Sequence, residues 1–347
     1  MLKAAVLGAG SWGTALANVL SSNGHDVIVW GRDRRVVDSL NYRHENDRYL
    51  PGAELSTTLR ATDDVNEALT DANFVIVSVP SKAIPDVCTL VAPYISSEAC
   101  VVHAVKGFIR PDNTRVAEYM AKALPKIAGR LVVLSGPSHA EEVVRRKPTT
   151  VVVASESRSA AEMAQDVLMN EHLRVYTQSD MVGVELGGTL KNIIALGVGL
   201  TDGLDLGDNT KAALMTRGLA EMTRLGVQLG ASPLTFSGLA GVGDLIVTCT
   251  SSHSRNYRAG KLLASGLTLS QTLSQIGMAV EGVGTTFAAA ELASSHHVEM
   301  PITRALRRVL EGLVAPENAV RELMQRDKNH EMEDVGQQPL THDWRRP

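Results

Sequence analysis

The sequence is poor in cysteine. Its three cysteines, Cys88, Cys100 and Cys249, are an odd number, form no CxxC pair and have no histidine partners at zinc-ligand spacing. His296 and His297 are adjacent, so a helix would point their rings in different directions. This pattern excludes a disulfide framework, offers no metal site and is typical of reduced thiols in a cytoplasmic protein.

The sequence also lacks a basic excess. Its 34 lysines and arginines are outnumbered by 38 aspartates and glutamates, which gives a formal net charge of −4. A dedicated nucleic-acid-binding protein normally carries a positive balance, so we expect no nucleic-acid partner. Net charge does not report individual clefts, and a local anion site stays compatible with this composition.

Long uninterrupted apolar runs are absent as well. The first twenty residues superficially resemble a signal peptide, but three glycines and several polar residues interrupt them. The second apolar stretch, residues 183–203, contains Glu185, Lys191 and Asp202. Ionised groups at this spacing disfavour a membrane span. We therefore expect a soluble, cytoplasmic protein.

What the sequence does contain is a change of periodicity near its middle. A length of 347 residues suggests two domains. Apolar runs alternate with helical patterns in the first half, which is typical of a doubly wound α/β sheet. Helical periodicity alone follows, and predicts an all-α second domain. The predicted strands are 3–7, 26–30, 73–79, 100–104, 131–134 and 149–154, and the predicted helices include 13–22, 184–200, 210–229, 269–275, 284–294 and 303–310. We place the domains at 1–182 and 183–327, with a polar, flexible tail at 328–347.

A glycine-rich turn follows the first predicted strand. Residues 6–13 read VLGAGSWG and contain GxGxxG between a strand and a helix. In this context Gly8 makes the tight turn, Gly10 lets the backbone approach a pyrophosphate, and Gly13 allows close helix–strand packing. The helix N-terminus adds N–H groups for phosphates. We predict a nicotinamide dinucleotide site here, the alternative being a glycine-rich turn without a ligand.

The end of the second strand bears on the choice of cofactor. NAD-specific domains usually place an acid there to accept hydrogen bonds from the ribose hydroxyls. In this sequence Gly31 and Arg32 stand at that place, followed by Asp33. A guanidinium can pair with a 2′-phosphate through two hydrogen bonds. We predict that NADPH is accepted and preferred over NADH. Asp33 leaves a ribose contact open, and the arginines also fit a solvated loop.

A lysine interrupts an otherwise apolar helix pattern. Lys191 lies in ELGGTLKNIIA, where loss of solvation would favour the neutral amine and lower its pKa. A general base at neutral pH needs such a shift. The alternative is a lysine whose amine extends to solvent.

A second polar segment follows further along the chain. Asp244 lies amid glycines and apolar residues, and Ser254, Arg255 and Asn256 follow it. These three residues at a helix start could bind a phosphate, or could form an ordinary capped helix N-terminus.

Several blocks of the sequence resemble the bacterial NAD(P)-dependent sn-glycerol-3-phosphate dehydrogenases. They are YLPG, SGPSHAEEV, ELGGTLKNIIA, LGDNTKAALMTRGLAEMTRLG and GLAGVGDLIVTCTSSHSRNYRAG. The resemblance runs from about residue 3 to about residue 320. It implies a Rossmann-type N-terminal domain, a helical C-terminal domain and a homodimer. It also implies metal-free, reversible NAD(P)H-dependent reduction of dihydroxyacetone phosphate to sn-glycerol 3-phosphate, which feeds glycerophospholipid synthesis.

The resemblance implies roles for individual residues. Lys191 resembles the family's proton acceptor from the C2 hydroxyl, and Asp244 the aspartate beside it. Lys106 resembles a lysine that touches cofactor and substrate, where its charge could polarise the C2 oxygen. The other implied substrate-site residues are Gly136, Ser138, Ser254, Arg255 and Asn256; the other implied cofactor-site residues are Ser11, Trp12, Tyr49, Ala140, Arg255, Ala279 and Glu281.

The sequence departs from the family pattern in three places. His139 stands where many relatives carry phenylalanine, and Gly284 replaces an arginine often found there. The tail after about residue 329 has no recognised counterpart. Two other functions fit parts of the pattern: a two-domain dehydrogenase of β-hydroxy acids or nucleotide sugars, and a non-enzymatic nucleotide sensor. The cluster at 254–256 favours a small phosphate ester, and a sensor would need no buried lysine.

Overall fold

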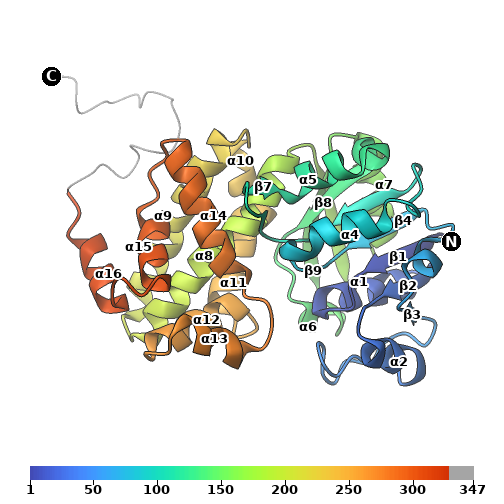
Figure 1. Cartoon of the computed structure of the whole chain (residues 1–347), viewed down its shortest axis with the longest axis horizontal. Coiled ribbons are helices and arrows are strands. Elements are labelled where there is room, and N and C mark those ends of the chain that lie inside the picture. The colour runs from blue at the N-terminus through green and yellow to red at the C-terminus, as the bar shows by residue number, and fades with distance from the viewer. Residues whose placement is uncertain (328–347) are drawn as a thin grey trace.

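The computed structural model describes residues 1–327, and the predicted tail at 328–347 lies outside them. A half built on a β-sheet is followed by a helical half (Figure 1). The strands are β1 (Lys3–Leu7), β2 (Asp26–Trp30), β3 (Arg60–Thr62), β4 (Phe74–Val77), β5 (Cys100–His103), β6 (Phe108–Ile109), β7 (Thr114–Arg115), β8 (Leu131–Ser135), β9 (Thr149–Ala154) and β10 (Leu173–Gln178). The helices of the first half are α1 (Ser11–Ser22), α2 (Arg34–Tyr42), α3 (Val65–Leu69), η1 (Ser81–Ala83), α4 (Ile84–Val91), α5 (Val116–Ala123), η2 (Pro125–Arg130), α6 (Ala140–Val143) and α7 (Arg158–Leu168). Those of the second half are α8 (Met181–Gly203), α9 (Gly207–Gln228), α10 (Pro233–Phe236), η3 (Leu239–Gly243), α11 (Asp244–Thr250), α12 (Arg255–Ala264), α13 (Leu269–Ile276), α14 (Glu281–Ser295), α15 (Pro301–Leu310) and α16 (Pro316–Met324).

The main sheet has the strand order β10-β9-β8-β5-β4-β1-β2-β3. β1 pairs in parallel with both β2 and β4, so the chain leaves β1 in one direction and returns to its other side. Loops at the carboxyl ends of β1 and β4 therefore diverge and leave a crevice, which is where open α/β sheets bind ligands. This arrangement confirms the predicted doubly wound fold.

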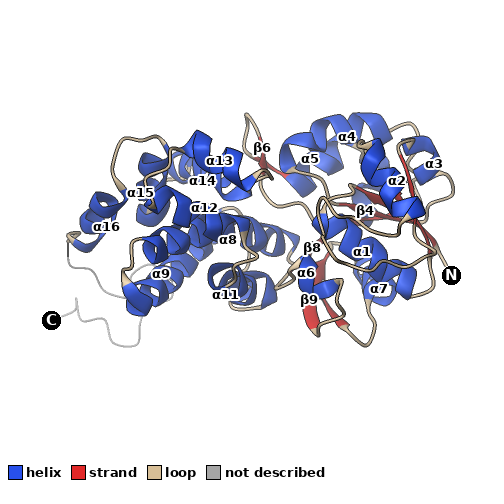
Figure 2. Cartoon of the chain, turned by 90° about the horizontal axis from the view of Figure 1, so that it is seen from below, coloured by secondary structure: helices blue, strands red, loops and turns tan. Residues whose placement is uncertain are grey.

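Both faces of the sheet are covered by helices. Ala4 and Val6 of β1 belong to a core formed with α1, α6 and α7, whereas Ala5 and Leu7 belong to a core formed with α3, α4 and α5. Helices lie on both sides of the strands in the second view as well (Figure 2). Successive residues of a strand point to opposite faces, so both sets must be apolar. This explains why the strands are continuous apolar runs in the sequence.

The apolar runs predicted a parallel sheet, but the sheet is not parallel throughout. β8 and β9 pair in antiparallel fashion, and β10 pairs in parallel with β9, so the last two strands are reversed. Two strands of this sheet were not predicted. β3 has only three residues, and β10 lies at the sheet edge, where buried and exposed residues alternate. Edge strands lack the continuous apolar run on which the prediction depended.

α8 is the central helix of the second half. It contacts α9, α11, α12 and α14, and nearly all of its residues are buried. By length and composition two described segments could cross a membrane, Met181–Gly203 and Pro233–Thr250. The apolar part of the first is 89% buried inside the structure, which is the position of a core helix, and the second consists of α10, η3 and α11. α8 begins near residue 182, where we place the boundary between the two domains. The boundary itself stays a prediction.

Candidate active site

A cleft of about 1940 Å³ lies between the two halves. Its walls come from the turn after β1, the ends of β2, β4, β5 and β8, the middle of α8, and the N-terminal ends of α12 and α14. Of the predicted site residues, those that line it are Gly8, Gly10, Ser11, Trp12, Arg32, Tyr49, Lys106, Gly136, Ser138, Ala140, Lys191, Ser254, Arg255, Asn256, Ala279 and Glu281. Gly13 and Asp244 lie behind this lining.

The turn after β1 has the geometry of a phosphate-binding loop. Gly8 has φ +118°, and a Cβ there would lie 2.4 Å from the carbonyl oxygen of Ser78. A Cβ on Gly13 would lie 1.9 Å from the carbonyl oxygen of Gly8, so the turn and α1 pack too closely for any side chain. Around Gly10 there is no atom within 4 Å of such a Cβ, and no side chain caps α1. A pyrophosphate therefore fits against the backbone at the helix N-terminus.

A loop after α2 holds this turn in place. The side-chain amide of Asn46 donates hydrogen bonds to the carbonyl oxygen of Ala9 at 2.9 Å and to the Thr14 hydroxyl at 2.8 Å. The Ser11 hydroxyl donates to the carbonyl oxygen of Tyr49 at 2.7 Å. Asn46 was missed because nothing in its local sequence marks it, and only the folded loop brings it to the turn.

After the end of β2, the side chains of Arg32 and Asp33 have different surroundings. The Asp33 carboxylate accepts a hydrogen bond from the Arg35 backbone N–H at 3.0 Å and forms an ion pair with Arg48. The Arg32 side chain is exposed in the cleft, and residues 1–327 provide it with no ion-pair partner. The carboxylate is thus already occupied, whereas the guanidinium of Arg32 is available to an anionic ligand.

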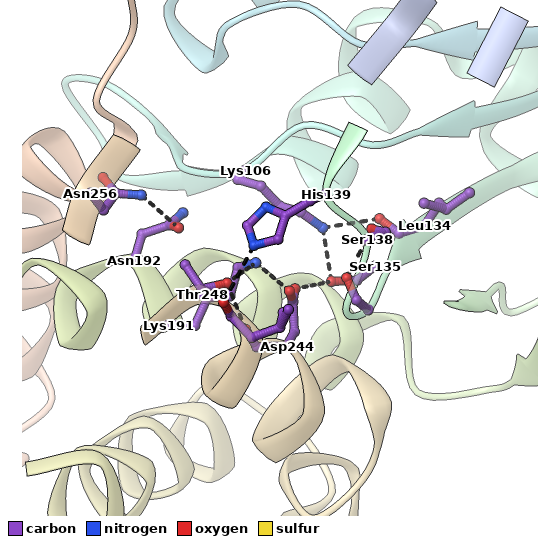
Figure 3. A network of polar contacts seen from close by, with 12 residues as sticks. Lys106, Leu134, Ser135, Ser138, His139, Lys191, Asn192, Asp244, Thr248 and Asn256 are labelled. Atoms are coloured by element: carbon purple, nitrogen blue, oxygen red, sulfur yellow. Dashed lines mark hydrogen bonds and ion pairs between the residues drawn. The ribbon is translucent and has the colours of Figure 1, made fainter. Parts of the chain in front are cut away.

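Two lysines meet at the floor of the cleft (Figure 3). The Nζ atom of Lys191 donates hydrogen bonds to an Asp244 carboxylate oxygen and, at 2.9 Å, to the Thr248 hydroxyl. The Lys191 side chain is 11% exposed and that of Asp244 is 1% exposed. Within its own helix Lys191 has apolar neighbours, but α11 provides this ion pair, so the amine is not isolated.

Lys106 approaches the same floor from the loop after β5. Its Nζ donates to the carbonyl oxygen of Leu134 at 3.1 Å and to the Ser135 hydroxyl at 2.8 Å. Burial is the main cause that lowers the pKa of Lys106 to about 8; the charge of Lys191 acts in the same direction, and those of Asp244 and Glu185 oppose it. Ser135 was missed, although it directly precedes the predicted Gly136. Thr248 was also missed, although it is one helical turn after Asp244 and so shares its face.

Of the three residues at the start of α12, two have hydrogen-bond partners, and one has none among residues 1–327. The Ser254 side chain caps the helix by accepting a hydrogen bond from the Tyr257 backbone N–H at 3.2 Å. The Asn256 side chain donates to Asn192 Oδ1 and accepts from the Gly282 backbone N–H, both at 2.9 Å. Arg255 is exposed in the cleft beside the helix N-terminus. The capped-helix interpretation is therefore confirmed for Ser254, whereas the anion-site interpretation stays a prediction that now depends on Arg255.

The remaining predicted residues lie along the walls. Gly136 has φ +128° and its carbonyl oxygen accepts a 2.9 Å hydrogen bond from the Ser138 hydroxyl. The Glu281 carboxylate accepts bonds from the hydroxyl and the N–H of Ser81, at 2.9 and 3.3 Å, and so joins the two halves. Burial raises the pKa of Glu281. Ala140 begins α6, and Ala279 is exposed shortly before α14.

His139, one of the departures from the family pattern, also lines the cleft. Its Nε2 lies 3.3 Å from the carbonyl oxygen of Val247, and its ring centroid is 5.7 Å from that of His253. Burial lowers the pKa of His139. Residues 1–327 contain no group of three or more histidine, cysteine, aspartate or glutamate side chains arranged to hold a metal ion.

Comparison with known proteins agrees with this geometry. The family model described as the NAD-dependent glycerol-3-phosphate dehydrogenase N-terminus matches residues 3–161, and the model of the C-terminus of the same family matches residues 180–321. Two similar relatives are named glycerol-3-phosphate dehydrogenase (NAD(P)+). The protein from Bacillus velezensis is 57% identical, with 96% of this chain and 97% of the relative covered; that from Bacillus subtilis is 55% identical over the same shares.

A solved structure extends the similarity to three dimensions. The crystal structure of glycerol-3-phosphate dehydrogenase from Coxiella burnetii is 39% identical and has a TM-score of 0.88, covering 93% of this chain and 98% of that one. Matches over both halves, together with a cleft that combines a dinucleotide turn with a buried lysine, agree with the resemblance noted from the sequence. The chain belongs to the NAD-dependent glycerol-3-phosphate dehydrogenase family.

Proposed function

We propose that the protein catalyses the reversible NAD(P)H-dependent reduction of dihydroxyacetone phosphate to sn-glycerol 3-phosphate. The observation that carries this proposal is the pairing of Lys191 with Asp244 at the floor of a cleft whose opposite wall is the dinucleotide turn. Arg255 lies in the same cleft, where it can bind the substrate phosphate. Two relatives above 50% identity carry the name of this activity.

In the proposed reduction the cofactor supplies a hydride to C2 of the substrate. The protonated amine of Lys191 donates its proton to the C2 oxygen, and the neutral amine is left beside Asp244 and Thr248. Lys106 adds positive charge near the oxygen while negative charge develops on it. In the reverse direction Lys191 would accept the hydroxyl proton, and the hydride would pass from C2 to the oxidised nicotinamide. Arg255 and the α12 N-terminus hold the phosphate and so orient C2.

The broader organisation is also proposed. We assign residues 1–182 to a dinucleotide-binding domain and residues 183–327 to a helical substrate and catalytic domain, with both domains contributing residues to the shared cleft. Glu281 and Ser81, which bond across the cleft, would keep the two domains aligned around both ligands. A homodimer, a cytoplasmic location and a supply of glycerol 3-phosphate to phospholipid synthesis are the corresponding proposals for the whole protein.

The direct test is NADPH oxidation by the purified protein, measured with three substrates in parallel. Dihydroxyacetone phosphate should support turnover. Dihydroxyacetone, which lacks the phosphate, should be a poor substrate, and a β-keto acid should be inactive. Preferred turnover of the β-keto acid would instead identify a β-hydroxy acid dehydrogenase, and NADPH binding without turnover of any substrate would favour a sensor.

The exposed position of Arg32 leads to a prediction about cofactor preference. Arg32→Ala should lower kcat/KM for NADPH by roughly tenfold or more, because one charge-assisted interaction with the 2′-phosphate is lost. The value for NADH should change little, since NADH lacks this phosphate. Steady-state kinetics with both cofactors measure the ratio. An equal loss with the two cofactors would show that Arg32 does not recognise the 2′-phosphate.

The lowered pKa of Lys106 predicts how activity changes with pH. A lysine is charged below its pKa, so the Lys106 ammonium is present below about pH 8 and is lost as the pH rises through that value. If its charge stabilises the C2 oxygen, kcat/KM for dihydroxyacetone phosphate should fall across the same range. Because kcat/KM reports groups of the free enzyme, this parameter is the one to measure between pH 6 and pH 10. A flat profile through about pH 8 would contradict the proposed role of Lys106.

A further inference from the structure

Ser135, at the end of β8, lies between Lys106 and Asp244 (Figure 3). Its hydroxyl oxygen accepts the 2.8 Å hydrogen bond from Lys106 Nζ. The same hydroxyl donates a long hydrogen bond, of 3.5 Å, to Asp244 Oδ2. The other oxygen of the same carboxylate binds Lys191. Ser135 is 1% exposed, so solvent does not compete for these bonds. A continuous chain of polar contacts thus joins the two lysines.

The helix opposite leaves room for this contact. A Cβ placed on Gly188 of α8 would lie 2.3 Å from the Ser135 hydroxyl and 2.7 Å from Lys106 Nζ. No side chain larger than that of glycine is compatible with both atoms where they stand. Gly188 belongs to the ELGGTLK block, three residues before Lys191. The helix that carries Lys191 therefore also accommodates the Lys106–Ser135 pair.

We propose that Ser135 is a positioning residue that couples Lys106 to Asp244. The buried Asp244 carboxylate would then bind Lys191 directly and Lys106 through the Ser135 hydroxyl during the proposed reaction. This inference rests on the proposed function, since it gives the coupling a catalytic purpose. Without the hydroxyl, Asp244 would contact Lys191 alone. Lys106 would keep only the carbonyl oxygen of Leu134 as an acceptor.

The charged and titratable groups around Lys106 single out Asp244. They are Glu185 and Lys191 on α8, Asp244 on α11 and His103 on β5. Burial lowers the pKa of His103 to about 3, so His103 is neutral at working pH. Glu185 already accepts 2.9 Å hydrogen bonds from Arg115 and from the backbone N–H of Ala117. Asp244 is thus the carboxylate that a bridging hydroxyl can link to Lys106.

The coupling has a defined consequence for protonation. Ser135 accepts a hydrogen bond from the Lys106 ammonium, and an acceptor favours the charged form. Removing the hydroxyl should therefore lower the pKa of Lys106 beyond the effect of burial. The ammonium would then be lost at a lower pH than in the unchanged protein, and any activity that depends on it would decline earlier.

The test compares Ser135→Ala with the unchanged protein by two measurements. Proteins labelled with 13C at lysine Cε are titrated by NMR, with the Lys106 resonance assigned by its absence in Lys106→Met. We expect the Lys106 midpoint, about pH 8 in the unchanged protein, to move to lower pH in Ser135→Ala. The alkaline limb of kcat/KM should move with it, giving roughly a tenfold loss above pH 8. The dissociation constant for NADPH should stay the same.

Two further variants separate positioning from general damage. Ser155→Ala removes another buried serine hydroxyl of the first half of the chain. This hydroxyl donates to the carbonyl oxygen of Leu131 and lies outside the cleft lining. The variant should leave the Lys106 midpoint unchanged. Ser135→Thr keeps a hydroxyl and should restore the midpoint. An unchanged midpoint in Ser135→Ala would overturn the inference. The titration needs no turnover, so inactivity of the unchanged protein would refute the proposed function and leave the coupling separately measurable.

Discussion

Replacing Lys191 with alanine should abolish turnover of dihydroxyacetone phosphate. We expect kcat to fall on the order of 10³- to 10⁴-fold, because proton transfer to the C2 oxygen and a positive charge beside it are lost together. The dissociation constant for NADPH should change little, since the dinucleotide turn lies on the opposite wall of the cleft. Single-turnover kinetics with dihydroxyacetone phosphate and fluorescence titration with NADPH measure the two effects.

This experiment needs a control for folding. Lys191→Ala leaves the Asp244 carboxylate buried without its ion-pair partner, and an unpaired buried charge destabilises a protein. The double variant Lys191→Met with Asp244→Asn removes that charge and should be equally inactive. Lys211 lies outside the cleft lining and forms ion pairs with Asp202 of α8 and Asp208 of α9, so Lys211→Met should keep full activity. A folded Lys191 variant with unchanged kcat would refute the assignment of this lysine as the acid and base.

The second large effect is expected at Arg255. Arg255→Ala should raise KM for dihydroxyacetone phosphate on the order of 10²-fold, because a charge-assisted pair with the phosphate is lost. Turnover of dihydroxyacetone, which we expect to be slow, should change little because that substrate has no phosphate. Initial-rate kinetics with both substrates give the comparison. They are measured at saturating NADPH, so that any weaker binding of the cofactor to the Arg255 variant does not affect the KM for the substrate.

Charge and geometry can be distinguished at this position. Arg255→Lys keeps the positive charge but not the two-pronged geometry of a guanidinium, so it should recover part of the loss. Arg304→Ala removes an exposed arginine on α15, outside the cleft lining, and should have no effect. An equal loss with the phosphorylated and unphosphorylated substrates would show that Arg255 does not anchor the phosphate.

Much of the fold was predictable because the relevant signals are local. The bounds of β1 and β2 agree with the predicted strands, since short apolar runs buried on two faces stand out from polar neighbours. The turn between Gly8 and Gly13 was recognisable for a similar reason. Its function depends on backbone shape over six residues, and glycine is the residue that such a shape requires.

Strand direction was not predictable in the same way. The apolar run of β9 resembles that of β8, yet the two strands are antiparallel. A strand buried on both faces needs apolar residues whichever way it runs, so the pattern carries no direction. The chain connections and the packing of α7 decide it, and these are properties of the folded sheet.

The candidate site shows the same division. The sequence by itself predicted a dinucleotide turn, a lysine within an apolar helix and a polar cluster at a helix start, because each of these features occupies a few consecutive positions. The tertiary structure decided that Asp33 is occupied by Arg48, that Lys191 pairs with Asp244, and that Ser135 lies between Lys106 and Asp244. Those partners are separated by 15 to 109 positions. Pairings over such distances follow from how the sheet and α8 pack, which no local pattern encodes.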